Sequence, residues 1–199
     1  QGNIAEAVSC FQKAIALNPL YVKALNNLGA LLQQQGELPG AIAYFQQALS
    51  ATSNYVPALI NLGVAMEAKC QPEEAKRFYQ QCIELEPDNP KGYYYLGTLC
   101  LKIHELEQAI SNLETALVLH PDSVEDLNNL GSALEGLGDI PRAISCYNQA
   151  LTIDAKCGKV HFNLALALLL TGDLMNQWRF HFPCNPNACP NSNWAVLLL

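Results

Sequence analysis

A Leu-Gly pair recurs along this chain at a constant spacing, and this spacing restricts the possible folds more than any other feature. The register continues at Leu164-Ala165, where Ala replaces Gly, and no insertion interrupts it. Such a period is typical of a repeat protein in which one small structural unit stacks on the next. The four pairs, each 34 residues after the last, are Leu28-Gly29, Leu62-Gly63, Leu96-Gly97 and Leu130-Gly131.

Three further positions recur with the same period, and they predict a pair of helices in each unit. Gly36 and Gly138 indicate a bend between the two helices, and Pro39 and Pro141 are typical of a first helical turn. Small side chains let two helices approach closely, and large apolar side chains fill the space beside them. The recurring positions hold a small residue (Ala7, Ala41, Ala75, Ala109, Ala143), a large one (Phe11, Phe45, Tyr79, Leu113, Tyr147) and a second small one (Ala14, Ala48, Cys82, Ala116, Ala150).

This pattern resembles that of the tetratricopeptide repeat family over residues 1 to 173. The resemblance implies an all-α fold, a right-handed superhelical solenoid of antiparallel helix pairs. We expect a partial repeat at 1–21, full repeats at 22–55, 56–89, 90–123 and 124–157, the first helix of a further repeat at 158–173, and an irregular tail at 174–199.

Composition narrows the classes of partner. The formal net charge is −7, with 11 Lys and Arg residues against 18 Asp and Glu residues. Nucleic acids and anionic membranes are bound by clustered basic residues, so we expect neither as a partner. The most apolar run, at 164–170, is far shorter than the roughly 20 residues of a membrane-spanning helix. Proteins or peptides are the expected partners.

The chain contains eight cysteines, which we interpret as reduced thiols. Reduced Cys behaves as a small apolar residue, and its use in this way predicts a cytoplasmic location. The chain starts at Gln1-Gly2-Asn3, and we interpret it as a fragment. The cysteines that fall within helical apolar patterns are Cys10, Cys70, Cys82, Cys100 and Cys146.

In the tetratricopeptide repeat family the first helix of each unit lines a concave groove, and here Asn recurs along that helix. Asn carries both a donor and an acceptor, so a row of Asn side chains can bind the backbone of an extended peptide. The row resembles the asparagine ladder of the repeat domain of O-GlcNAc transferases, although Asn is also a common exposed residue at this position. The residues before each recurring Leu are Asn27, Asn61, Tyr95, Asn129 and Asn163.

Tyr94 and Tyr95 add aromatic surface to the predicted groove, whereas Tyr93 occupies the large apolar position of its unit. A second kind of groove, the dicarboxylate clamp that captures acidic chaperone tails, needs Lys and Arg at set positions. Lys23, Lys91 and Lys159 match one basic position, but the Arg position holds Asn or Tyr, which disfavours the clamp. The predicted peptide-binding residues are Asn27, Asn61, Tyr94, Tyr95, Asn129 and Asn163.

The sequence contains no motif typical of catalysis. His104, His120 and His161 are scattered, without a Cys, Ser or Asp at a recurring spacing, and we expect surface or turn positions for them. We therefore predict no enzymatic activity, no cofactor and no metal site in this chain.

The repeat pattern fails after residue 174. The positions expected to hold Ala, an aromatic residue and Ala hold Gln177, His181 and Cys184. We interpret the tail as a product of a shifted reading frame or as an irregular cap, and two Cys residues, Cys184 and Cys189, without a second pair lack a standard zinc spacing. Residues 168–174 with Trp178 resemble the last repeat of bacterial proteins in which such an array leads into a glycosyltransferase domain.

Three hypotheses for function follow. The first is a non-catalytic scaffold that binds extended polypeptide segments in the groove. The second is the substrate-recognition arm of a larger O-GlcNAc-transferase-type glycosyltransferase. The third is a rod that associates with other copies through its exposed ends.

Overall fold

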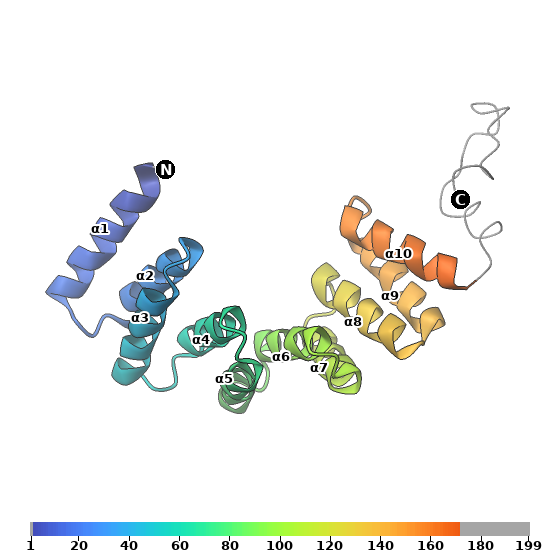
Figure 1. The fold of residues 1–199 in the computed structure, drawn as a ribbon, viewed down its shortest axis with the longest axis horizontal. Coiled ribbons are helices and arrows are strands. Elements are labelled where there is room, and N and C mark those ends of the chain that lie inside the picture. The colour runs from blue at the N-terminus through green and yellow to red at the C-terminus, as the bar shows by residue number, and fades with distance from the viewer. Residues whose placement is uncertain (1, 172–199) are drawn as a thin grey trace.

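The computed structural model describes residues 2–171, and all regular secondary structure in this range is helical. Figure 1 shows the helices stacked in chain order. The prediction of an all-α solenoid of helix pairs is therefore confirmed. The helices are α1 (Gly2–Leu17), α2 (Val22–Gln34), α3 (Leu38–Ala51), α4 (Val56–Ala68), α5 (Pro72–Leu85), α6 (Pro90–Lys102), α7 (Leu106–Leu119), α8 (Val124–Leu137), α9 (Ile140–Ile153) and α10 (Gly158–Leu170).

Packing in the described range is local along the chain. Each helix packs against its immediate neighbours, and α2, α4, α6, α8 and α10 also pack against one another in succession. In Figure 1 the stack follows an arc, with α4 and α6 on its inner side and α5 and α7 on its outer side. The first helices of the pairs thus form one continuous concave row.

Glycine is required where the two helices of a pair cross. An added Cβ atom at Gly63 would lie 2.3 Å from Cε1 of Tyr79, and one at Gly131 would lie 2.4 Å from Cε1 of Tyr147. Both tyrosine side chains are fully buried. The Leu-Gly period therefore marks the points at which a large side chain of the second helix lies directly on the backbone of the first; this side chain is aromatic in three pairs and Leu113 in the pair α6/α7.

The predicted starts of two second helices are also confirmed. Pro39 lies at the second position of α3 and Pro141 at the second position of α9. The side chain of Asp139 caps α9 by accepting a hydrogen bond from the backbone N–H of Arg142 at 3.3 Å. Gly36 and Gly138, which precede these helices, both have positive φ angles.

Two of the five cysteines assigned to helical apolar patterns are exposed, and one of these two lies outside a helix. Cys70 lies in the turn between α4 and α5, is exposed and has a φ of 58°, so its assignment to a helical apolar pattern is wrong. Cys10 lies in α1 but is exposed as well. By contrast, Cys82 and Cys100 are buried, and burial raises the pKa of Cys82 to about 12 and that of Cys100 to about 11.

The left-handed turn recurs in every pair, although Gly does not. Gly36, Cys70, His104 and Gly138 are spaced by 34 residues and all have positive φ angles. A side chain in this conformation costs roughly 1–2 kcal/mol because Cβ approaches the following carbonyl oxygen. The same turn is thus built with two glycines and two residues that are strained there.

Replacing His104 with Gly is therefore expected to raise the free energy of unfolding by about 1 kcal/mol, and Cys70→Gly should act in the same direction. Chemical denaturation followed by circular dichroism measures the change. As the matched control, Gly36→Ala introduces a side chain at the equivalent turn and should destabilise the protein. An unchanged or lowered stability of both Gly variants would contradict this explanation.

Candidate functional site

A pocket of about 420 Å³ lies between α4 and α6, on the concave row of first helices. Three of the six predicted binding residues line it, namely Asn61, Tyr94 and Tyr95. The remaining lining residues are Val56, Pro57, Ile60, Glu86, Asn89 and Lys91. The pocket therefore combines an apolar and aromatic wall with amide groups and one side chain of each charge.

Tyrosine rings form the wall on the α6 side. The ring of Tyr95 is stacked on the ring of Tyr79, with centroids 5.4 Å apart, and contacts the ring of Tyr94 edge-on at 5.1 Å. The buried Tyr79 hydroxyl donates a 2.6 Å hydrogen bond to Glu67, which fixes the ring beneath Tyr95. Tyr93, predicted to be a core residue, is half-buried.

Tyr94 is the less constrained of the two tyrosines that line the pocket. Its side chain is half-buried, and burial, followed by the nearby Tyr95, raises the pKa of its hydroxyl. The hydroxyl therefore remains protonated at physiological pH and can donate a hydrogen bond. An aromatic ring with a protonated hydroxyl offers both apolar contact area and a polar group to a ligand.

The predicted Asn row is distributed over different environments. Asn27 is exposed, Asn61 and Asn163 are half-buried, and Asn129 is buried. The Asn129 amide donates to the Thr98 hydroxyl at 3.3 Å. Within the row, the side chain of Asn27 is therefore the most accessible to solvent, those of Asn61 and Asn163 are partly accessible, and that of Asn129 is the least accessible.

Two residues next to the row have a role that the sequence analysis missed. Asn61 donates a 2.9 Å hydrogen bond to Asn26, and Asn163 donates a 2.8 Å hydrogen bond to Asn128. Each bond joins the first helices of two successive pairs. An Asn side chain has two donor hydrogens and an acceptor oxygen, so Asn61 retains its oxygen and one hydrogen for another partner. In both cases the accepting Asn lies 35 residues before the donating Asn, and this repeated spacing is the feature of the sequence that could have indicated the bonds.

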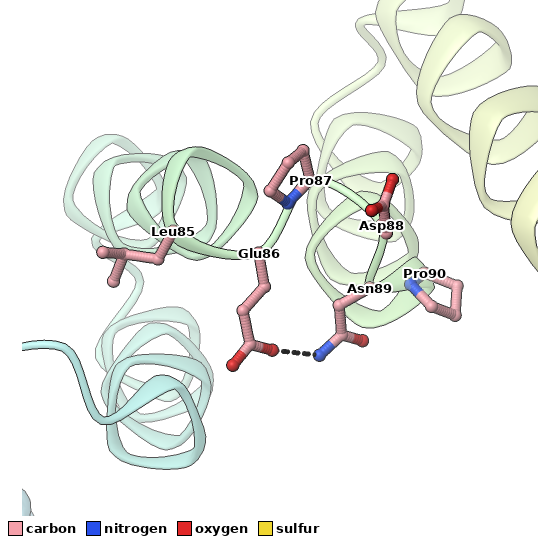
Figure 2. A pocket seen from close by; sticks show the side chains of 6 residues that line it. All are labelled: Leu85, Glu86, Pro87, Asp88, Asn89 and Pro90. Atoms are coloured by element: carbon pink, nitrogen blue, oxygen red, sulfur yellow. Dashed lines mark hydrogen bonds between the residues drawn. The ribbon is translucent and has the colours of Figure 1, made fainter.

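Beside the pocket lies the α5–α6 turn, whose side chains are shown in Figure 2. It forms a shallow hollow of about 570 Å³, lined by the six consecutive residues Leu85 to Pro90. Glu86 accepts a 2.6 Å hydrogen bond from the Asn89 side chain, which caps α6 by accepting from the backbone N–H of Lys91. This network holds Glu86 and Asn89 at the rim of both hollows.

The described residues contain no group of three or more His, Cys, Asp or Glu side chains arranged to hold a metal ion. None of the helices in residues 2–171 has both the length and the apolar character needed to cross a membrane. His104 and His120 are exposed, and His161 is half-buried. The predictions for Gln177, His181, Cys184, Cys189 and the rest of the tail lie outside the described residues.

Several solved structures share this fold. YrrB, described as a tetratricopeptide repeat protein with an unusual peptide-binding site, is 22% identical, with 94% of this chain and 96% of that chain covered and a TM-score of 0.68. MamA from Desulfovibrio magneticus RS-1 is 21% identical over 81% of this chain and 91% of that chain, with a TM-score of 0.72. TTC0263, a tetratricopeptide repeat protein from Thermus thermophilus, is 22% identical over 84% and 92%, with a TM-score of 0.69.

A search of the curated proteins gives no match. Four family models, each described as tetratricopeptide repeat, match residues 1–56, 32–88, 78–111 and 127–157. None of these findings supports the glycosyltransferase hypothesis. The matches extend over most of the helical range, and the solved structures share its architecture. This chain therefore belongs to the tetratricopeptide repeat family.

Proposed function

We propose that this chain is a non-catalytic scaffold whose concave face binds an extended polypeptide segment. The proposed contact residues are Asn27, Asn61, Tyr94, Tyr95, Asn129 and Asn163. The observation that carries the proposal is the pocket between α4 and α6, which is lined by Asn61, Tyr94 and Tyr95. Its volume of about 420 Å³ lies within the range of pockets that accept small ligands or side chains.

The pocket supports the binding of a side chain of the peptide. Ile60, Tyr94 and Tyr95 provide apolar contact area, and the stack of Tyr95 on Tyr79 fixes one ring in advance. A ring that is already ordered loses little conformational entropy when a ligand binds. An apolar or aromatic side chain of the peptide is therefore the anchor that this pocket favours.

The amide groups support the binding of the peptide backbone. Asn61 has hydrogen-bonding capacity beyond its bond to Asn26, and Asn27 is exposed one pair earlier along the same row. Backbone N–H and C=O groups recur along an extended segment whatever its side chains are. Anchoring in the pocket and amide contacts along the row would together hold such a segment along the concave face. The peptide-binding site described for YrrB, which has the same fold, supports this kind of use.

The test begins with a phage-displayed library of random peptides, from which the 199-residue chain selects a binder. Fluorescence anisotropy then measures the affinity of that labelled peptide for variants. Tyr94→Ala is expected to weaken binding by about 10- to 100-fold, because it removes one of the two tyrosine rings that form the wall of the pocket. The double variant Asn27→Ala with Asn61→Ala should also weaken capture, with a small change in thermal unfolding.

Val118→Ala is the matched control, because Val118 is an exposed apolar residue of α7, outside the pocket. It should bind the selected peptide like the original chain. Equal affinities of the Tyr94, Asn and Val118 variants would overturn the proposal, as would a library from which no peptide is selected.

A further inference from the structure

Acidic side chains are concentrated at two turns between helix pairs, both in the middle of the described array. The turns α1–α2 and α3–α4 contain no charged residue, and the turn α9–α10 contains one Asp and one Lys. The turns α5–α6 and α7–α8, with the helical turns that flank them, hold Glu84, Glu86, Asp88, Asp122, Glu125 and Asp126. The turns between pairs are thus strongly acidic in the middle of the array and close to neutral elsewhere.

Most of these carboxylates are available to a ligand. All six residues except Asp126 are exposed, and none of the six belongs to an ion pair within residues 2–171. By contrast, the carboxylate of Glu67 on α4 is paired with Lys102 on α6. The basic residues at the same two turns are Lys91 and His120, so acidic residues outnumber them. A negative charge that the described chain does not neutralise therefore remains at this edge.

The two acidic turns border the pocket between α4 and α6. Glu86 lines the pocket itself, and so does Tyr94. Burial is the largest cause of the raised pKa of the Tyr94 hydroxyl and Tyr95 is the next, and the negative charges of Asp126 and Glu125 add to them. In the stack, α6 lies between α4 and α8 (Figure 1). The Tyr94 side chain therefore lies between the pocket and the carboxylates at the start of α8.

An aromatic ring beside a carboxylate favours a basic side chain. A guanidinium or ammonium group on the face of Tyr94 is attracted by the ring, and it can pair with the exposed carboxylate of Glu125. Asp126 adds negative charge behind this position, since it is buried and its Oδ1 atom has no hydrogen-bond partner among the described residues. A neutral side chain would gain neither interaction, and an acidic one would be repelled.

We propose that the concave face selects a basic peptide segment, with an apolar side chain in the pocket between α4 and α6 and an Arg or Lys side chain between Tyr94 and Glu125. The inference rests on the proposed function and names the chemical class of its partner. The axes of packed helices lie about 8–10 Å apart, and an extended chain advances about 3.3 Å per residue. The basic residue is therefore expected about three residues from the apolar anchor.

The composition of the selected peptides is the first test. From the displayed library, the 199-residue chain should select peptides that carry Arg or Lys about three residues from an apolar anchor. In a synthetic copy of one such peptide, Gln in place of the basic residue should weaken binding about 10-fold, and Glu should weaken it further. Rising salt concentration should weaken the binding of the basic peptide and leave that of the Gln peptide nearly unchanged.

Two outcomes of this test separate the inference from the function on which it rests. Selected peptides without this basic residue, or a Glu peptide that binds as well as the basic one, would overturn the inference. If Tyr94→Ala still weakens such peptides, the peptide-binding function itself would stand. A library from which no peptide is selected would overturn both.

Neutral replacements in the chain are the second test. Glu86→Gln combined with Glu125→Gln preserves the size of both side chains, and this double variant should bind the basic peptide about 10-fold more weakly. Lys91→Gln should have the opposite effect, with binding about 3-fold tighter, because Lys91 lines the pocket and repels a basic ligand. General damage to the fold would weaken binding in every variant.

Glu107→Gln is the matched control, because Glu107 is an exposed carboxylate of α7, on the outer side of the arc. It removes one of the same charges away from the pocket and should bind the basic peptide like the original chain. The Gln peptide is a further control, since the double variant and the original chain should bind it alike. Equal affinities of the double variant and the original chain for the basic peptide, or weaker binding by Lys91→Gln, would overturn the proposal.

Discussion

Replacing Tyr147 with Ala is expected to lower the free energy of unfolding by about 3–5 kcal/mol. The ring has no exposed surface and lies directly on the backbone of α8 at Gly131. Its hydroxyl donates a 3.1 Å hydrogen bond to Glu135. Ala would leave a cavity between α8 and α9, since two packed helices cannot close a gap of this size without losing other contacts.

Tyr147→Phe separates the ring from the hydroxyl. It retains the packed ring and should cost about 1 kcal/mol through the lost hydrogen bond. Because repeat arrays can unfold in parts, hydrogen exchange of the α8 and α9 amides should accompany chemical denaturation. If the Ala and Phe variants are equally stable, the ring is not the element that holds the pair together.

Replacing Asp126 with Ala is expected to stabilise the protein by about 1–3 kcal/mol at neutral pH. Asp126 is only 3% exposed, and its Oδ1 atom has no hydrogen-bond partner among the described residues. The equivalent residues of the other pairs are uncharged: Ala24, Ala58, Gly92 and Val160. A buried carboxylate thus occupies a position built for a small or apolar side chain.

The stabilisation by Asp126→Ala should increase as the pH rises from acidic to neutral. Burial raises the pKa of Asp126 above its ordinary value of 3.8. A hydrogen bond between the Ser123 side chain and the carboxylate, and the nearby His120, lower this pKa by less than burial raises it. The folded state therefore disfavours the charged form, and the cost appears as the pH rises from the ordinary value through the raised one. In acid, where Asp126 is protonated both folded and unfolded, the advantage of the Ala variant should shrink.

Denaturation curves at neutral and acidic pH measure this difference. Glu125→Ala is the matched control, since Glu125 carries the same charge in the same helical turn but is exposed to solvent. It should change the stability little, or lower it slightly through the helix dipole. An Asp126→Ala variant that is less stable than the original chain at neutral pH would contradict the explanation.

The helix pairs and their crossing points could be predicted from the sequence because they depend on local and periodic constraints. Gly63 and Tyr79 belong to two recurring positions, and their contact follows once both helices form. The left-handed turns at Cys70 and His104 could not be predicted from residue type, because Gly is the residue that favours a positive φ. Their spacing from Gly36 and Gly138 was the better indicator.

The site was less predictable than the fold. The sequence places Asn61 on the first helix of its pair, but the bond to Asn26 depends on how far one pair is rotated on the next. Neither residue spacing nor propensity determines that rotation. Asn129 is buried and Asn27 is exposed, although the two residues occupy the same position of their repeats. Side-chain position along a helix was predictable, and exposure between stacked pairs was not.

The strictly sequential packing of the described helices has a mechanical consequence. Since α1 and α10 share no contacts, no interaction between the ends fixes their separation. A small tilt at each of the successive interfaces adds up along the stack, so the array can lengthen or shorten like a spring while every pair keeps its own core. The side-chain hydrogen bonds from Asn61 to Asn26 and from Asn163 to Asn128 would then limit that movement at two interfaces, one near each end of the described helices.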